Sequence, residues 1–95
     1  MIDTAGTISK ASDMLMEKGA LSVRAVATHA VFSGQAYDRL AKSALKEIVV
    51  SDTIPLRPPK DADTSKITVL TVANMFADVI DRVYNYKSIS PIFEF

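Results

Sequence analysis

Apolar residues recur at helical spacing in three stretches of the chain. The first stretch predicts a helix over residues 7–18, and Gly19 directly after it provides a natural C-terminal stop. The second stretch predicts a helix over residues 35–44, and the third predicts a helix over residues 74–86. The apolar stripe of the last helix consists of Met75, Phe76, Val79, Ile80 and Val83.

Three short runs rich in apolar and β-branched residues alternate with these helices. They predict strands over residues 22–28, 47–50 and 67–72. Residues 52–65 contain three prolines and several charges, which suit a solvated connection without a helix. Because strands alternate with helices, the sequence predicts an α/β fold with a largely parallel sheet.

The connections that follow the strands are the expected place for a ligand, since open α/β sheets bind ligands beyond the carboxyl ends of their strands. Residues 3–7, 28–34 and 51–53 are expected to lie together at that edge. The single histidine, His29, falls in this region, and we interpret it as structural rather than catalytic.

The run Ile2-Asp3-Thr4-Ala5-Gly6-Thr7 has the composition of an anion-binding loop. Gly6 permits a tight turn and a close approach of the backbone to a ligand. Thr4 and Thr7 offer hydroxyl donors, while Asp3 can accept hydrogen bonds from a sugar hydroxyl or hold a metal-bound water. The N–H groups and the dipole of the following helix favour negative charge at the same place. The alternative is a plain strand-to-helix turn with a threonine N-cap.

Composition excludes several classes of function. The formal net charge is zero, which gives no support for binding to nucleic acid or to an anionic membrane. The absence of cysteine excludes disulfides and thiolate metal sites and fits a reducing, cytoplasmic location. No apolar run approaches the length that spans a membrane.

The length of 95 residues predicts one small domain or a piece of a larger one. A βαβ unit needs a strand before its first helix, and the residues before position 7 are too few to supply a complete strand. We therefore expect that the chain begins late relative to a full domain.

Four stretches stand out when they are taken together: residues 2–8, residues 27–36, residues 50–55 and residues 85–90 with the apolar pair that follows at 92–93. In this order they resemble the C-terminal part of the ribose-phosphate pyrophosphokinase (phosphoribosyl pyrophosphate synthetase) family. The first stretch is shared with phosphoribosyltransferases, whereas the second and third are more specific.

The resemblance implies a phosphoribosyltransferase-type (type I) fold, with residues 1–95 as the C-terminal part of the second such domain. It implies transfer of diphosphate from ATP to the 1-hydroxyl of ribose 5-phosphate, with magnesium offsetting the phosphate charge. It also implies a homo-oligomer, a hexamer in the parent family. No nucleic acid or membrane partner is expected.

The resemblance assigns two sets of binding residues. Asp3, Thr4, Ala5, Gly6 and Thr7 match the ribose 5-phosphate loop of the family. Ser88 and Ser90 match a serine pair that, in the regulated class, helps form an anion site between subunits for phosphate or ADP. The alternative for the serines is local capping at the end of the last helix.

Departures from the family pattern bear on activity. The family has two aspartates just before the position of Met1, and its catalytic loop and metal-binding histidine lie further upstream. The chain is therefore expected to hold no catalytic or metal-ligating residue and to be inactive alone. Gln35 replaces a usual proline, Tyr86 replaces a frequent glycine, and Pro91 follows the serine pair.

Two other functions stay open at this point. A phosphoribosyltransferase uses a similar loop for the same sugar phosphate, although that class does not share residues 28–36 and 52–55 in this form. A non-catalytic module associated with the synthetase would keep the fold without activity. Binding of ribose 5-phosphate without turnover would be compatible with either an enzyme fragment or such a module.

Overall fold

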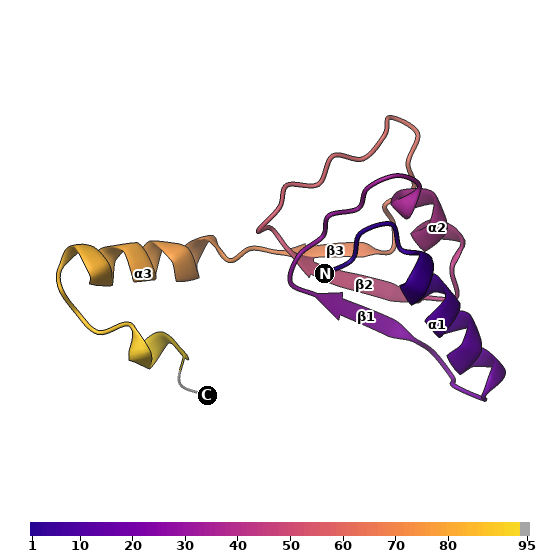
Figure 1. Ribbon diagram of the computed structural model, residues 1–95, viewed down its shortest axis with the longest axis horizontal. Coiled ribbons are helices and arrows are strands. Elements are labelled where there is room, and N and C mark those ends of the chain that lie inside the picture. The colour runs from indigo at the N-terminus through magenta and orange to yellow at the C-terminus, as the bar shows by residue number, and fades with distance from the viewer. Residues whose placement is uncertain (94–95) are drawn as a thin grey trace.

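The computed structural model describes residues 1–93, and Figure 1 shows the order of their elements. Each predicted helix and strand is present, with ends that differ by a few residues. The elements are α1 (Gly6–Glu17), β1 (Arg24–Ala27), α2 (Ala36–Lys42), β2 (Glu47–Ser51), β3 (Ile67–Leu70), α3 (Ala73–Tyr84) and a 3₁₀ turn at Ser90–Phe93. None of the helices in residues 1–93 has the length and apolarity that crossing a bilayer requires.

The three strands form one sheet in the order β1-β2-β3, and both pairings are parallel. The register aligns Ala25 with Ile48 and Ile48 with Ile67, so these side chains lie on one face of the sheet. The predicted α/β fold with a parallel sheet is confirmed.

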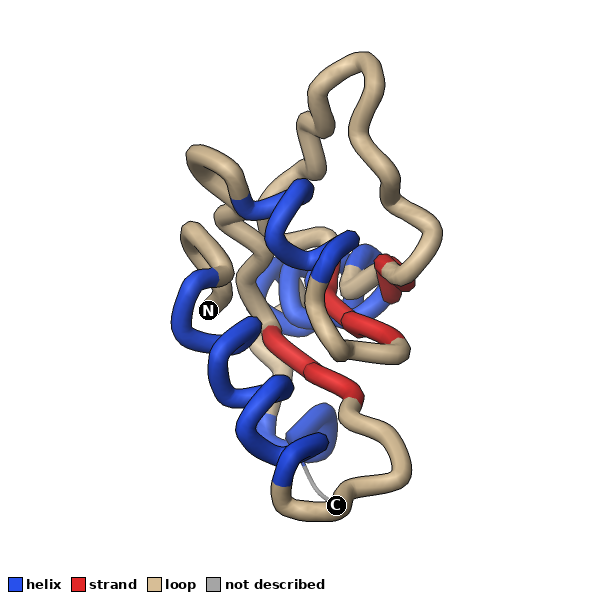
Figure 2. Tube along the Cα trace, turned by 90° about the vertical axis from the view of Figure 1, so that its right-hand side faces the viewer, coloured by secondary structure: helices blue, strands red, loops and turns tan. Residues whose placement is uncertain are grey.

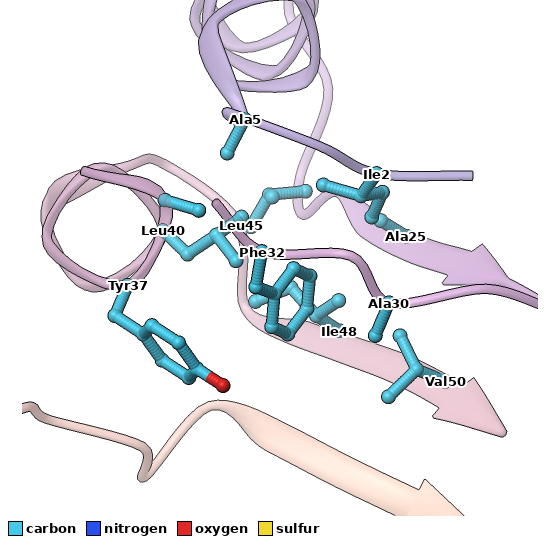
Figure 3. Close-up of a cluster of buried hydrophobic side chains, with 11 residues drawn as sticks. Ile2, Ala5, Ala25, Ala30, Phe32, Tyr37, Leu40, Leu45, Ile48 and Val50 are labelled. Atoms are coloured by element: carbon cyan, nitrogen blue, oxygen red, sulfur yellow. The ribbon is translucent and has the colours of Figure 1, made fainter. Parts of the chain in front are cut away.

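The core lies on one face of this sheet (Figure 3). Ile48 and Val50 of β2 and Leu40 of α2 are fully buried, and the ring of Phe32 meets that of Tyr37 edge-on at 5.3 Å between centroids. On β1, by contrast, Ala25 is buried while its neighbour Val26 is 81% exposed. The helices of residues 1–93 therefore cover only one side of the strands.

Helix α3 lies apart from this core. Figures 1 and 2 show α1 and α2 beside the strands, and Figure 1 shows α3 beyond the opposite end of the sheet. None of its residues is buried. The predicted apolar stripe is present, but it is largely exposed within residues 1–93, with Phe76 at 51% and Ile80 at 67%.

Helices α1 and α3 end in the same hydrogen-bonding pattern, the Schellman motif. After α1, Gly19 adopts φ 100° and its N–H bonds to the carbonyl of Met16, which confirms the predicted stop. After α3 the equivalent residue is Tyr86, at φ 57°, and its N–H bonds to the carbonyl of Val83. This left-handed conformation explains why glycine suits the position where the chain carries tyrosine.

We predict that Tyr86→Gly stabilises the end of α3, because it removes the cost of about 1 kcal/mol that a side chain brings to the left-handed region. The measurement is backbone NMR, with Cα shifts and amide exchange read over residues 80–87. Lys87→Gly is the matched control, since Lys87 does not have a positive φ, and it should loosen the same turn. Equal effects of the two changes would contradict the explanation.

Candidate phosphate-binding site

Two segments far apart in the sequence are joined at the carboxyl edge of the sheet. The N–H of Ile2 donates to the carbonyl of His29 at 3.0 Å, and the N–H of Val31 donates to the carbonyl of Ile2 at 3.0 Å. The N–H of Ser33 donates to the carbonyl of Asp3 at 3.0 Å. These bonds place the N-terminal segment beside the connection after β1, as the sequence predicts.

The turn into α1 has an unexpected conformation. Ala5, not Gly6, adopts the left-handed region, with φ 66°, and it is almost completely buried. A Cβ on Gly6 would make only ordinary contacts, at 3.7 Å from Nη1 of Arg39 and 3.9 Å from Oγ1 of Thr4. The expectation that Gly6 supplies the backbone freedom for the turn is therefore wrong in this structure.

The start of α1 has no side-chain cap, so the alternative of a threonine N-cap is also wrong. Among residues 1–93, the N–H groups of Ala5, Gly6 and Thr7 donate no hydrogen bond. These are the donors that the first turn of a helix leaves free, at the positive end of its dipole. They border a cavity of about 350 Å³ lined by residues 1–8 and Ala11.

The hydroxyl of Ser33 donates to Oδ1 of Asp3 across this edge. The bond fixes the carboxylate beside the loop and occupies one of its two oxygens. Ser33 falls in residues 27–36, one of the four stretches that carry the family resemblance, but the sequence indicates no role for it. Its partner Asp3 is 30 positions away, and no local pattern connects the two.

Arg39 is the second residue that sequence reasoning missed. It lies on α2, and its Nη1 donates to the carbonyl oxygen of Thr4 at 3.1 Å. The guanidinium therefore contacts the backbone of the predicted phosphate loop from outside the cavity lining. The sequence shows Arg39 only as a basic residue in the last turn of a short helix.

His29 joins the connections after β1 and β2. Its Nδ1 lies 2.8 Å from Oγ1 of Thr53, and the hydroxyls of Ser51 and Thr53 both donate to the carbonyl of Thr28, at 2.5 and 3.1 Å. These bonds hold the ends of two neighbouring strands together. His29 thus takes part in this hydrogen-bonded connection, and its interpretation as structural rather than catalytic stays a prediction.

Asp52 extends the same edge to β3. Its Oδ1 accepts the N–H of Val72 at 2.9 Å, and its own N–H donates to the carbonyl of Leu70 at 3.2 Å. The bond from Val72, together with one from the hydroxyl of Thr71, lowers the pKa of the Asp52 carboxyl below its ordinary value of 3.8.

Ser88 and Ser90 lie in the exposed segment after α3, away from the N-terminal loop (Figure 1). Oγ of Ser88 accepts the N–H of Ser90 at 3.2 Å, and the carbonyl of Ser88 accepts a bond from Arg82 at 3.1 Å. The first of these bonds lies at the start of the 3₁₀ turn and does not cap α3, whose cap residue is Asn85. The structure does not bring the serines to the phosphate loop.

No group of three or more His, Asp or Glu side chains within residues 1–93 is arranged to hold a metal ion. The carboxylates of α3 instead serve the helix itself: Asp78 pairs with Arg82 at 3.1 Å.

Comparison with known proteins identifies the chain. The family model of the phosphoribosyl synthetase-associated domain matches residues 1–94. The chain belongs to this family.

Its relatives support the resemblance drawn from the four stretches. The chain is 54% identical over 93 residues to a ribose-phosphate pyrophosphokinase of Wolinella succinogenes and 53% identical to one of Campylobacter jejuni. In both cases the match covers 98% of this chain and 29% of the relative. The chain thus spans less than a third of the length of these relatives.

The fold is also that of a solved relative. The phosphoribosylpyrophosphate synthetase of Mycobacterium smegmatis matches with a TM-score of 0.83 and 40% identity, over 90% of this chain and 28% of that one. The arrangement of the phosphoribosyl synthetase-associated domain is therefore shared with part of a synthetase.

We predict that Asp52 makes stability depend on pH. Its pKa is lowered in the folded chain, so its contribution is complete above the unfolded-state pKa of about 3.9 and is lost as the pH falls through the folded-state pKa. In Asp52→Asn, the free energy of unfolding should fall less between about pH 5 and about pH 2 than in the wild type.

Urea unfolding at several pH values measures this difference. Asp61→Asn, a change at an exposed residue of the connection between β2 and β3, is the control and should keep the wild-type pH dependence. If the free energy of unfolding of Asp52→Asn falls with pH as steeply as that of the wild type, the bond from Val72 to Asp52 does not contribute to the pH dependence of stability.

Proposed function

We propose that this chain forms the ribose 5-phosphate-binding part of a ribose-phosphate pyrophosphokinase. The observation that carries the proposal is the group of free N–H donors at the start of α1, beside a cavity of about 350 Å³. It is supported by 54% identity to a protein of that name.

The loop binds a terminal phosphate through neutral donors. The N–H groups of Ala5, Gly6 and Thr7 and the dipole of α1 favour a dianion at the cavity. The hydroxyls of Thr4 and Thr7 add donors that can rotate toward the phosphate oxygens. This combination needs no lysine or arginine in the lining.

Asp3 orients the sugar. The bond from Ser33 holds its carboxylate at the rim of the loop, where its other oxygen accepts a hydroxyl of the ribose. A phosphate held at one end and a hydroxyl held at the other fix the direction in which the 1-hydroxyl points.

In the complete reaction, the oxygen of the ribose 1-hydroxyl attacks the β-phosphorus of ATP, the bond between that phosphorus and the α-phosphate oxygen breaks, and AMP leaves. This chain contributes acceptor binding and positioning, which account for much of the catalysis in phosphoryl transfer. Residues 1–93 offer no cluster that fits a magnesium ion, so we assign magnesium to ATP and to residues outside this chain.

Ser88 and Ser90 form, in this proposal, one half of an anion site for phosphate or ADP at a boundary between subunits of a homo-oligomer. Their exposure and their distance from the loop suit a second, separate site. The proposal places the enzyme, a hexamer, in the cytoplasm.

A non-catalytic module is the second candidate, favoured by the family model that matches residues 1–94, which is described as a phosphoribosyl synthetase-associated domain. Both candidates bind ribose 5-phosphate. Under both candidates this chain alone, with ATP, magnesium and ribose 5-phosphate, should form no phosphoribosyl pyrophosphate. The candidates differ for a longer protein that contains the chain, which should form this product if the chain is part of a synthetase.

The binding test is an NMR titration of the chain with ribose 5-phosphate. We expect a dissociation constant on the order of 1 mM and the largest amide shifts at residues 5–7. Ribose without the phosphate should give no such shifts at the same concentration. A titration in which residues 5–7 do not respond to ribose 5-phosphate would overturn the proposed function.

A matched pair of variants at Thr7 isolates the effect of charge on ligand binding. Thr7 is exposed and lines the cavity, so both Thr7→Asn and Thr7→Asp should fold, and both remove the same hydroxyl. The two differ by one negative charge at the loop, and repulsion at about 5 Å should make Thr7→Asp bind ribose 5-phosphate about tenfold more weakly than Thr7→Asn. Equal affinities would mean that the phosphate lies elsewhere.

A further inference from the structure

The guanidinium of Arg39 contacts the backbone of the phosphate loop. Its Nη1 donates to the carbonyl of Thr4 at 3.1 Å, and it lies 3.7 Å from the place where a Cβ on Gly6 would be. The residues that line the cavity include Thr4 and Gly6 and do not include Arg39.

This contact controls the direction of a donor. The peptide bond between Thr4 and Ala5 is trans, so its carbonyl and its N–H point in opposite directions. A bond that holds the Thr4 carbonyl toward α2 consequently turns the Ala5 N–H the other way, toward the cavity.

The conformation of Ala5 shows why the carbonyl needs to be held. Ala5 has φ 66°, a region that alanine disfavours. Rotation of the Thr4–Ala5 peptide would change φ of Ala5 and relieve this strain, but it would also withdraw the N–H from the cavity. The bond from Arg39 opposes that rotation.

The charge of Arg39 is also available to the loop. Within residues 1–93, Arg24 and Arg82 form ion pairs with carboxylates, whereas no ion pair is formed by Arg39. A charged donor on the carbonyl polarises the peptide and makes its N–H a stronger donor. The lining of the cavity contains no lysine or arginine, so this remote charge matters more than it would beside another cation.

We propose that Arg39 is a positioning residue of the phosphate site: by holding the carbonyl of Thr4, it aims the N–H of Ala5 at the phosphate of the ligand. This inference rests on the proposed function, because it takes the cavity to be the site of the sugar phosphate.

The test compares three variants of the chain by NMR titration with ribose 5-phosphate. Arg39→Met keeps the apolar stem but removes the charged donor, and it should weaken binding about tenfold. Arg39→Lys keeps a charged donor and should remain within about threefold of the wild type. Lys42→Met, a change at an exposed cation of the same helix that pairs with Asp38, is the control for net charge and should change binding less than about twofold.

A second readout separates positioning from general loss of structure. Without ligand, the amide and Cα resonances of Ala5 should move in Arg39→Met and return toward wild-type values in Arg39→Lys. Resonances of the buried core residues Ile48 and Val50 should stay in place in all three variants.

The possible failures are distinguishable. A wild-type chain that does not bind ribose 5-phosphate overturns the proposed function and the role of Arg39 with it. A wild type that binds, with Arg39→Met equally tight or with Lys42→Met equally weakened, overturns the role of Arg39 alone. Core resonances that collapse in both Arg39 variants would show that the residue is needed for folding, and would also overturn the positioning role.

Discussion

The backbone hydrogen bonds between residues 2–3 and residues 29–33 hold the N-terminal segment at the carboxyl edge of the sheet. They bury Ile2 against the core and bring the start of α1 to the end of the parallel sheet. The free N–H groups of the helix, the carboxylate of Asp3 and the hydroxyl of Ser33 meet there as a consequence. Because each bond joins segments distant in sequence, the site exists only when the sheet and its connections are folded.

The proposed phosphate site relies on backbone donors and a helix dipole more than on formal charge. The cavity lining includes amides, threonine hydroxyls and one carboxylate, and no basic side chain. In our proposal the cation of Arg39 acts on the Thr4 peptide group and does not bind the ligand itself. Such an arrangement suits a ligand that has a phosphate at one end and hydroxyls along its length.

The structure divides into a packed part and an exposed part. One face of the sheet carries the core and the loop, whereas Val26 on the other face and the stripe of α3 are exposed within residues 1–93. Parallel sheets are commonly covered on both faces, and exposed apolar groups of this kind mark surfaces of interaction. Ser88 and Ser90 lie in the exposed segment that follows α3. Their assignment to an anion site stays a prediction.

Local signals in the amino-acid sequence were sufficient for the elements, the α/β class and the place of the loop, because periodicity, glycine stops and strand composition act over a few residues. The left-handed turn fell on Ala5 rather than Gly6, since burial and long-range bonds override the preference of a single residue. The contact of Arg39 with Thr4 joins residues 35 positions apart, and the position of α3 apart from the core does not follow from its apolar stripe. Such features follow from contacts that form only in three dimensions, so only the tertiary structure could decide them.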